Sequence, residues 1–131
     1  GIPDSRVDEV LELVELTEAA NKRTKNYSLG MKQRLALAGA ILGDPEVLIL
    51  DEPANGLDPL GIAWLRKFLR SLAGSGRTIL VSSHQLAEMQ NTVDDVIIMH
   101  KGKLITSGSM KEIIKDGTLE EAFLKLTEGV N

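Results

Sequence analysis

The sequence predicts an α/β fold with a mainly parallel core sheet, because short apolar runs alternate with helical patterns. Residues 47–50 form a continuous apolar run, the pattern of a parallel strand buried on both faces, and residues 78–82 form a second strand of this kind. Aromatic residues make up only 3% of the 131 positions, so we expect an aliphatic core. This length fits one domain or part of a larger one.

The N-terminal part is expected to be helical. Residues 6–17 carry apolar side chains at i, i+3, i+4 and i+7 counted from Val7, which predicts a helix. Ser5, followed three residues later by Asp8, resembles a capping box at its start. The polar and basic residues 21–27 (NKRTKNY) are expected to form a loop.

The central part alternates between helices and strands. A helix is predicted over residues 30–42, with Gly43 as a C′ residue and Pro45 preventing its continuation. After the strand at 47–50 comes a Pro- and Gly-rich turn, followed by a helix over residues 60–73 with an apolar stripe. The strand at 78–82 completes this part of the sheet.

The C-terminal part begins with a short helix over residues 85–91. Two apolar segments then flank the dipeptide Lys101-Gly102, which predicts a β-hairpin. Two helices are expected to end the chain. These predicted elements are strands at 95–100 and 103–106 and helices at 109–115 and 118–128.

Composition excludes several classes of function. Fifteen basic against nineteen acidic residues give a net charge of −4, so binding of nucleic acid is not expected. The absence of Cys excludes disulfides, thiolate catalysis and Cys-based zinc sites, and it is compatible with a reducing cytoplasm. The apolar runs are far shorter than the ~20 residues that span a bilayer.

The segment VLILDE, residues 47–52, carries the first candidate site. The carboxyl edge of a parallel sheet is where α/β folds bind ligands, and Asp51 and Glu52 are expected there. Asp51 could hold Mg²⁺, usually through water, and Glu52 could orient a water for attack on a phosphoryl group. A strand that simply ends in acidic loop residues explains these six residues equally well.

Two further features follow along the chain. The turn PANGLDP, residues 53–59, would hold Asp58 close to the acidic pair, although such residues alone indicate only a turn. Ser82, Ser83 and His84 end the next strand. One helix and one strand separate His84 from Asp51, so a right-handed crossover places His84 at the same sheet edge, where it could contact a γ-phosphate. A lone histidine in this position is more often structural or solvated.

The segment YSLGMKQR, residues 27–34, lies at the start of a predicted helix. Ser28 and Gly30 could form an anion site from backbone N–H groups at the positive helix end. An ordinary N-cap explains Ser28 as well, because Ser is among the commonest capping residues.

Taken in this order, the segments YSLGMKQRL, VLILDEPANGLDP and VSSH closely resemble the signature, Walker B, D-loop and switch-histidine motifs of ATP-binding cassette (ABC) ATPases. The resemblance runs from Tyr27 to Ser109. It implies the C-terminal part of a P-loop NTPase-type nucleotide-binding domain with a terminal hairpin. It also implies a division into the end of a helical subdomain (1–29), a catalytic α/β core (30–109) and C-terminal helices (110–131).

The resemblance implies roles for the sheet-edge residues. Asp51 would be the carboxylate on the Mg²⁺ side, and Glu52 the general base or water-orienting residue. His84 would sense the γ-phosphate. The implied cofactors are ATP and Mg²⁺, and the implied reaction is hydrolysis of ATP to ADP and phosphate.

The resemblance also implies contacts with a partner. Ser28 and Gly30 match signature positions that close over ATP bound to the opposite subunit, and Asp58 matches the D-loop residue that contacts that subunit. Two nucleotide-binding domains would therefore sandwich two nucleotides head to tail.

The sequence departs from the family pattern in two ways. In place of the usual signature LSGGQ it has YSLGM, so Leu29 replaces the first Gly and Met31 the Gln. The form SLGMKQRL with NGLDP resembles cassettes of bacterial multidrug and peptide-antibiotic exporters. Secondly, the phosphate-loop pattern G-x-x-x-x-G-K-[ST] is missing from the sequence, and we expect it upstream of Gly1.

The resulting hypothesis is the ATPase subunit of an ABC transporter, an exporter, which lies at the cytoplasmic face of the membrane and works with a transmembrane permease. The chain alone is expected to be inactive. Two alternatives stay open. One is an ABC protein that acts on ribosomes or in DNA repair, and the other is a stand-alone interaction module that never binds ATP.

Overall fold

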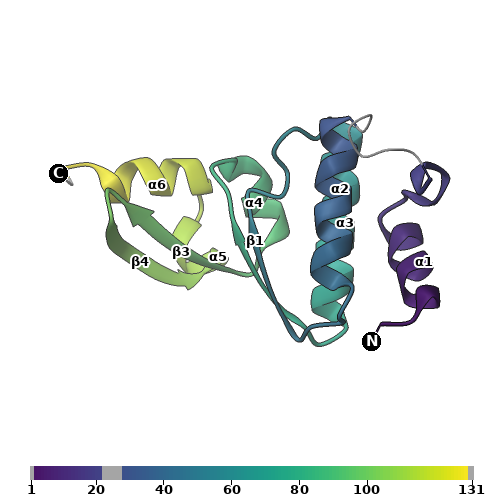
Figure 1. Ribbon diagram of the computed structural model, residues 1–131. Helices are drawn as coiled ribbons and strands as arrows, with labels where there is room; N and C mark the ends of the chain where they lie inside the picture. The colour runs from purple at the N-terminus through teal and green to yellow at the C-terminus, as the bar shows by residue number, and fades with distance from the viewer. Residues whose placement is uncertain (1, 22–27, 130–131) are drawn as a thin grey trace. The chain divides into compact units, whose positions relative to one another are not determined.

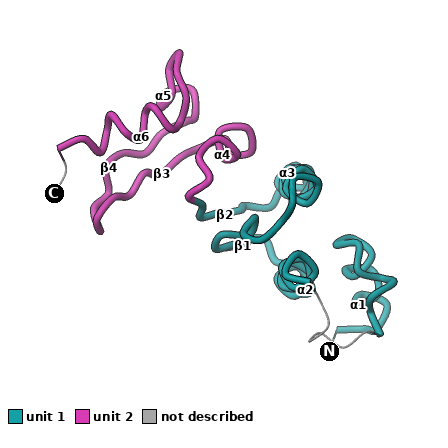
Figure 2. Tube along the Cα trace, turned by 90° about the horizontal axis from the view of Figure 1, so that it is seen from above, with its two compact units in different colours: residues 1–83 teal, residues 84–131 magenta. Residues whose placement is uncertain are grey.

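The computed structural model describes residues 2–21 and 28–129, which fall into two units, Gly1–Ser83 and His84–Asn131 (Figure 2). Each unit contains its own pair of strands. The predicted loop at 21–27 lies outside the described residues except for Asn21. Among the helices that the structure describes, none has the length and apolar character needed to cross a membrane.

The first unit is built on a parallel strand pair (Figure 1). Strand β1 (Val47–Asp51) lies beside β2 (Thr78–Ser82), with Asp51 opposite Ser82 in the register. Helix α3 (Pro59–Gly74) connects the two strands, as in the predicted crossover. The parallel pairing confirms the α/β prediction for this part of the chain.

Helices cover one face of this strand pair. Helix α2 (Leu29–Ile41) and α3 pack on the sheet, and α1 (Asp4–Leu13) lies beyond them, followed by a 3₁₀ turn (Thr17–Ala19) (Figure 1). The core is aliphatic as expected, apart from the ring of Phe68. Its buried members are Val10, Val14, Leu16, Leu37, Ala38, Ile41, Leu48, Leu50, Ala54, Leu65, Phe68 and Leu69.

The other face of the strand pair is open, so the prediction of strands buried on both faces was wrong. Leu48 and Leu50 are buried under the helices, whereas Val47 is 59%, Ile49 74% and Leu80 52% exposed. Successive side chains of a strand point to opposite faces. Within the described part of the first unit, helices lie on only one of those faces (Figure 1).

The second unit contains the predicted hairpin. Strands β3 (Asp95–His100) and β4 (Lys103–Ser109) are antiparallel, and Lys101 and Gly102 both have positive φ, at 50° and 75°. Two consecutive residues with positive φ are typical of a tight hairpin turn. Helices α4 (Leu86–Thr92), α5 (Met110–Ile114) and α6 (Leu119–Thr127) complete the unit.

Both ends of α1 differ from the predictions. Helix α1 starts at Asp4 after the N-cap Pro3, so Ser5 lies inside the helix and the predicted capping box does not form. It ends at Leu13, because the backbone of Glu15 is left-handed (φ 62°). At the end of α2, Gly43 follows the C-cap Leu42 and is the C′ residue as predicted, and the next residue, Asp44, has the left-handed backbone (φ 53°).

Candidate functional site

One serine hydroxyl joins the two acidic residues at the carboxyl edge of the parallel strand pair. Asp51 is the last residue of β1 and lies opposite Ser82, the last residue of β2. The Ser82 hydroxyl donates to Asp51 Oδ1 and accepts from the backbone N–H of Glu52 at 3.0 Å. The same Glu52 N–H lies 3.1 Å from the Ser82 carbonyl oxygen. The register of the strands therefore holds these three residues together.

Glu52 has a left-handed backbone. Its φ is 50°, a conformation that few residues other than Gly adopt and that costs roughly 1–3 kcal/mol when it occurs at a functional site. The chain turns sharply there, and the N–H of Asn55 donates to the Glu52 carbonyl at 3.1 Å. Because Pro53 and Ala54 are buried, the turn is anchored directly behind the two carboxylates.

Asp58 lies at the far end of the same turn. It is the N-cap of α3, and its Oδ1 accepts from the N–H of Gly61 at 2.8 Å. Pro59 occupies the first helical position, where its missing N–H has no consequence. The Asp58 side chain is exposed and helps to fix the start of α3. Its contact with a partner subunit stays a prediction.

Ser28 is the N-cap of α2. Its Oγ accepts from the N–H of Met31 at 3.1 Å, and Gly30 lies in the first turn of the helix. The ordinary capping explanation of Ser28 is therefore confirmed. The same geometry leaves Ser28 exposed at the positive end of a helix, where an anion is favoured. Tyr27 lies outside the described residues.

His84 is the first residue of the second unit. It is exposed, and it lines a shallow depression together with Glu88 of α4 and Glu120 of α6. Its expected place beside Asp51 stays a prediction.

Two of these segments also contact each other. The side-chain amide of Gln33, in the second turn of α2, donates to the carbonyl of Asn55 in the turn at 53–58, with a distance of 2.6 Å. Leu29 packs against Gly56 of the same turn. Neither this contact nor the role of Ser82 was predicted, because both depend on which segments meet in space. The signal that the sequence offered for Ser82 was a polar residue at the end of the second strand, as Asp51 is at the end of the first.

The residues fit a magnesium ion held with a nucleotide. Magnesium is usually bound through one or two carboxylates, waters and substrate phosphates, and Asp51 is an exposed carboxylate at the sheet edge. Among the described residues, no group of three His, Cys, Asp or Glu side chains could hold a metal alone. The arrangement therefore suits an ion that arrives with phosphate oxygens.

Comparison with known proteins gives a consistent result. The family model described as "ABC transporter" matches residues 2–55. The chain is 50% identical over 113 residues to the "Uncharacterized ABC transporter ATP-binding protein YhcH" of Bacillus subtilis (strain 168), which covers 86% of this chain and 37% of that protein. It is 47% identical over 116 residues to the "Bacitracin transport ATP-binding protein BcrA" of Enterococcus faecalis, which covers 88% of this chain and 38% of that protein.

A solved structure shares the fold. The ATP-binding subunit of an ABC transporter superimposes with a TM-score of 0.85 at 28% identity, over 98% of this chain and 57% of that protein. The chain thus spans less than two fifths of the length of the two curated relatives.

Proposed function

We propose that this chain, which belongs to the ABC transporter family of ATP-binding proteins, forms the C-terminal part of an ATPase subunit. The complete subunit hydrolyses ATP to ADP and phosphate and drives transport through a transmembrane permease. Two such nucleotide-binding domains act as a head-to-tail pair at the cytoplasmic face of the membrane. The similarity to a bacitracin transport protein supports an exporter.

The observation that carries this proposal is the arrangement of Asp51, Glu52 and Ser82 at the carboxyl edge of the parallel strands. In the proposed mechanism Glu52 orients the attacking water and accepts its proton, as a carboxylate within hydrogen-bond reach can do. Asp51 would hold, through water, the Mg²⁺ that accompanies the nucleotide. Bound Mg²⁺ neutralises charge on the phosphate oxygens.

The remaining residues contact the nucleotide or the partner. Ser28 and Gly30 offer a hydroxyl and backbone N–H groups at the start of α2 to phosphate oxygens of ATP held by the opposite subunit. Asp58 faces that subunit, and His84 contacts the γ-phosphate.

The decisive experiment replaces each carboxylate in the full-length ATPase that contains this chain. Glu52→Gln keeps the shape and hydrogen bonding of the side chain but removes the charge that activates water, so hydrolysis should fall by about 10²–10⁴-fold. ATP binding should persist, because the phosphate loop and Mg²⁺ provide most of the contacts to ATP. The variant should therefore accumulate as an ATP-bound dimer.

Asp51→Asn is the matched comparison and should in addition raise the Mg²⁺ concentration needed for half-maximal activity. An unchanged rate in Glu52→Gln would show that Glu52 is not the base. An equal loss of binding and turnover would show that Glu52 has a structural role.

The 131 residues alone should neither bind ATP tightly nor hydrolyse it, because the phosphate-loop pattern is missing from them. Isothermal calorimetry with Mg-ATP measures this directly. Saturable binding in the micromolar range would contradict the assignment of this chain as one part of the site.

A further inference from the structure

The first turns of α2 touch the turn at 53–58 through side chains that the proposed function does not use. Leu29 lies across Gly56. A Cβ atom placed on Gly56 would come within 2.3 Å of Leu29 Cδ2 and 2.5 Å of Leu29 Cγ. Gly56 also has φ +84°, so the turn uses both its left-handed backbone and its missing side chain. Leu29 is one of the residues at which this chain departs from the usual signature.

Two further contacts join the same segments. The Gln33 amide donates to the Asn55 carbonyl at 2.6 Å. On the other side, Leu57 Cδ2 lies 3.6 Å from the point that a Cβ on Gly30 would occupy, so the Leu57 side chain lies beside Gly30. Three consecutive residues of the turn, 55–57, are therefore held by the start of α2, and all of these residues belong to the first unit.

These contacts lie between two residues of the candidate site. Ser28 directly precedes Leu29, and Asp58 directly follows Leu57. We propose that Leu29 and Gln33 are positioning residues that latch the start of α2 to the turn at 53–58, so that Ser28 and Asp58 move as one body. This inference rests on the proposed function, in which Ser28 and Asp58 both face the opposite subunit. Nucleotide contact at Ser28 is thereby transmitted to the turn that carries Asp58.

Hydrogen exchange tests the latch without requiring ATP. In the full-length ATPase, Leu29→Ala should speed amide exchange several-fold in a peptide covering 53–58, although that peptide is unchanged in sequence. Leu29→Met, which keeps the apolar contact, should restore slow exchange, whereas Leu29→Gly should not. Leu60→Ala is the matched control, because Leu60 is 82% exposed at the start of α3.

Unchanged exchange over 53–58 in Leu29→Ala, or equal acceleration by Leu60→Ala, would overturn the latch. Altered exchange together with no ATP hydrolysis by the parent protein would leave the latch standing and refute the proposed function. The two failures are therefore distinguishable.

A double-mutant cycle provides the second measurement. Gly56→Ala introduces backbone strain at φ +84° in any background, but it meets Leu29 only when Leu29 is present. The increase in the unfolding equilibrium constant caused by Gly56→Ala should therefore be smaller in the Leu29→Ala background by at least about threefold. Additive losses would show that Leu29 and Gly56 do not interact.

Discussion

At the scale of single residues, the Ser82 hydroxyl connects both acidic groups of the candidate site. It donates to the Asp51 carboxylate and accepts from the Glu52 backbone. Removal of the hydroxyl takes away the hydrogen bond to the Asp51 carboxylate, whereas the Glu52 N–H keeps the Ser82 carbonyl oxygen as an acceptor. Ser82 is therefore expected to set the orientation of the Asp51 carboxylate and to hold the backbone of Glu52, without contacting the nucleotide itself.

We predict that Ser82→Ala in the full-length ATPase lowers kcat and raises the Mg²⁺ concentration needed for half-maximal activity. A loss of roughly tenfold matches the ~1.4 kcal/mol typical of one such hydrogen bond. Ser82→Thr keeps the hydroxyl and should restore most of the activity. Wild-type Mg²⁺ dependence in Ser82→Ala would show that Asp51 is oriented by other groups.

A second prediction at this scale concerns Asp44 and Arg77. A hydrogen bond from Arg77, and then its positive charge, lower the pKa of Asp44 below 3.8, with a further contribution from the charge of Arg6. A carboxylate with a lowered pKa in the folded state contributes stability above its unfolded pKa, and this is lost as pH falls through the folded value. The free energy of unfolding should therefore decline as the pH falls from the unfolded-state pKa of Asp44 through its lowered folded-state pKa.

Asp44→Asn should remove this part of the decline, so its stability should differ from that of the wild type near neutral pH and converge with it once the pH falls below the lowered pKa of Asp44. Urea unfolding from about pH 6 to pH 2 measures the effect, with Asp116→Asn as the surface control. Parallel curves for wild type and Asp44→Asn would contradict it.

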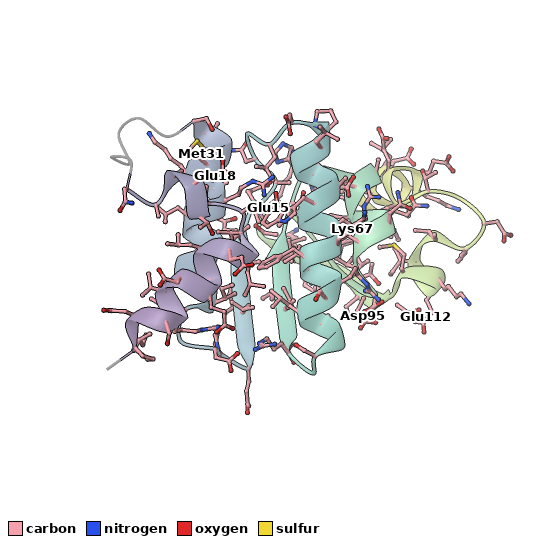
Figure 3. The ribbon with its side chains drawn as sticks, turned by 90° about the vertical axis from the view of Figure 1, so that its right-hand side faces the viewer. Glu15, Glu18, Met31, Lys67, Asp95 and Glu112 are labelled. Carbon is pink, nitrogen blue, oxygen red and sulfur yellow. The ribbon has the colours of Figure 1, made fainter. Side chains whose placement is uncertain are left out.

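At the scale of elements, two arginines join α1 and α2 in a reciprocal manner. Arg6 of α1 donates to the carbonyls of Ile41 at 2.8 Å and Leu42 at 3.2 Å, at the C-terminal end of α2. Arg34 of α2 donates to the carbonyl of Val14, just past α1, and pairs at 3.1 Å with Glu15, which is labelled in Figure 3. A cation at a helix C-terminus is favoured by the exposed carbonyls there.

Arg34 also lies over the Trp64 ring of α3, with its guanidinium carbon 4.0 Å from the ring centroid. Arg34 therefore joins its own helix α2 to the residues just past α1 and to α3. This cation–π contact contributes on the order of 1 kcal/mol.

We predict that Arg6→Ala destabilises the α1–α2 pair by roughly 1–2 kcal/mol, because two carbonyls at the end of α2 lose a charged donor. Thermal unfolding of the full-length protein measures this. Lys32→Ala, at an exposed position of α2, is the control and should change the melting temperature little. Equal effects of the two substitutions would contradict the capping role of Arg6.

The elements also show what the sequence could and could not predict. The bounds of β1 and β2 follow from apolar runs, and the hairpin follows from Lys101-Gly102 between two such runs. The expectation that β1 is covered on both faces failed, because an apolar run describes the strand and not its neighbours. The contact of Leu29 with Gly56 requires tertiary proximity, which periodicity does not contain.

At the scale of the whole molecule, apolar side chains are exposed on a strand face in each unit. They are Val47, Ile49 and Leu80 in the first unit and Ile97, Met99 and Leu104 in the second. Exposed apolar surface and unpaired strand edges are sites of association between chains. The six residues therefore mark surface that another polypeptide segment would stabilise by covering it.

We predict that the 131-residue chain self-associates at micromolar concentration and binds a hydrophobic dye such as ANS. Analytical ultracentrifugation should show oligomers that Ile49→Lys reduces, because Ile49 is 74% exposed on the open face. Leu60→Lys is the control, since Leu60 is 82% exposed on a helix. A monodisperse monomer with a sharp, cooperative melt would contradict this prediction.

The left-handed backbone at Glu52 has a consequence for laboratory evolution. Gly or Asn would adopt φ 50° with less strain than Glu, so either replacement should be accepted readily by a screen that rewards heat resistance alone. Such a screen would exchange the carboxylate for a better-tolerated turn residue. Position 52 is thus a place where selection for thermostability and selection for turnover would choose different amino acids.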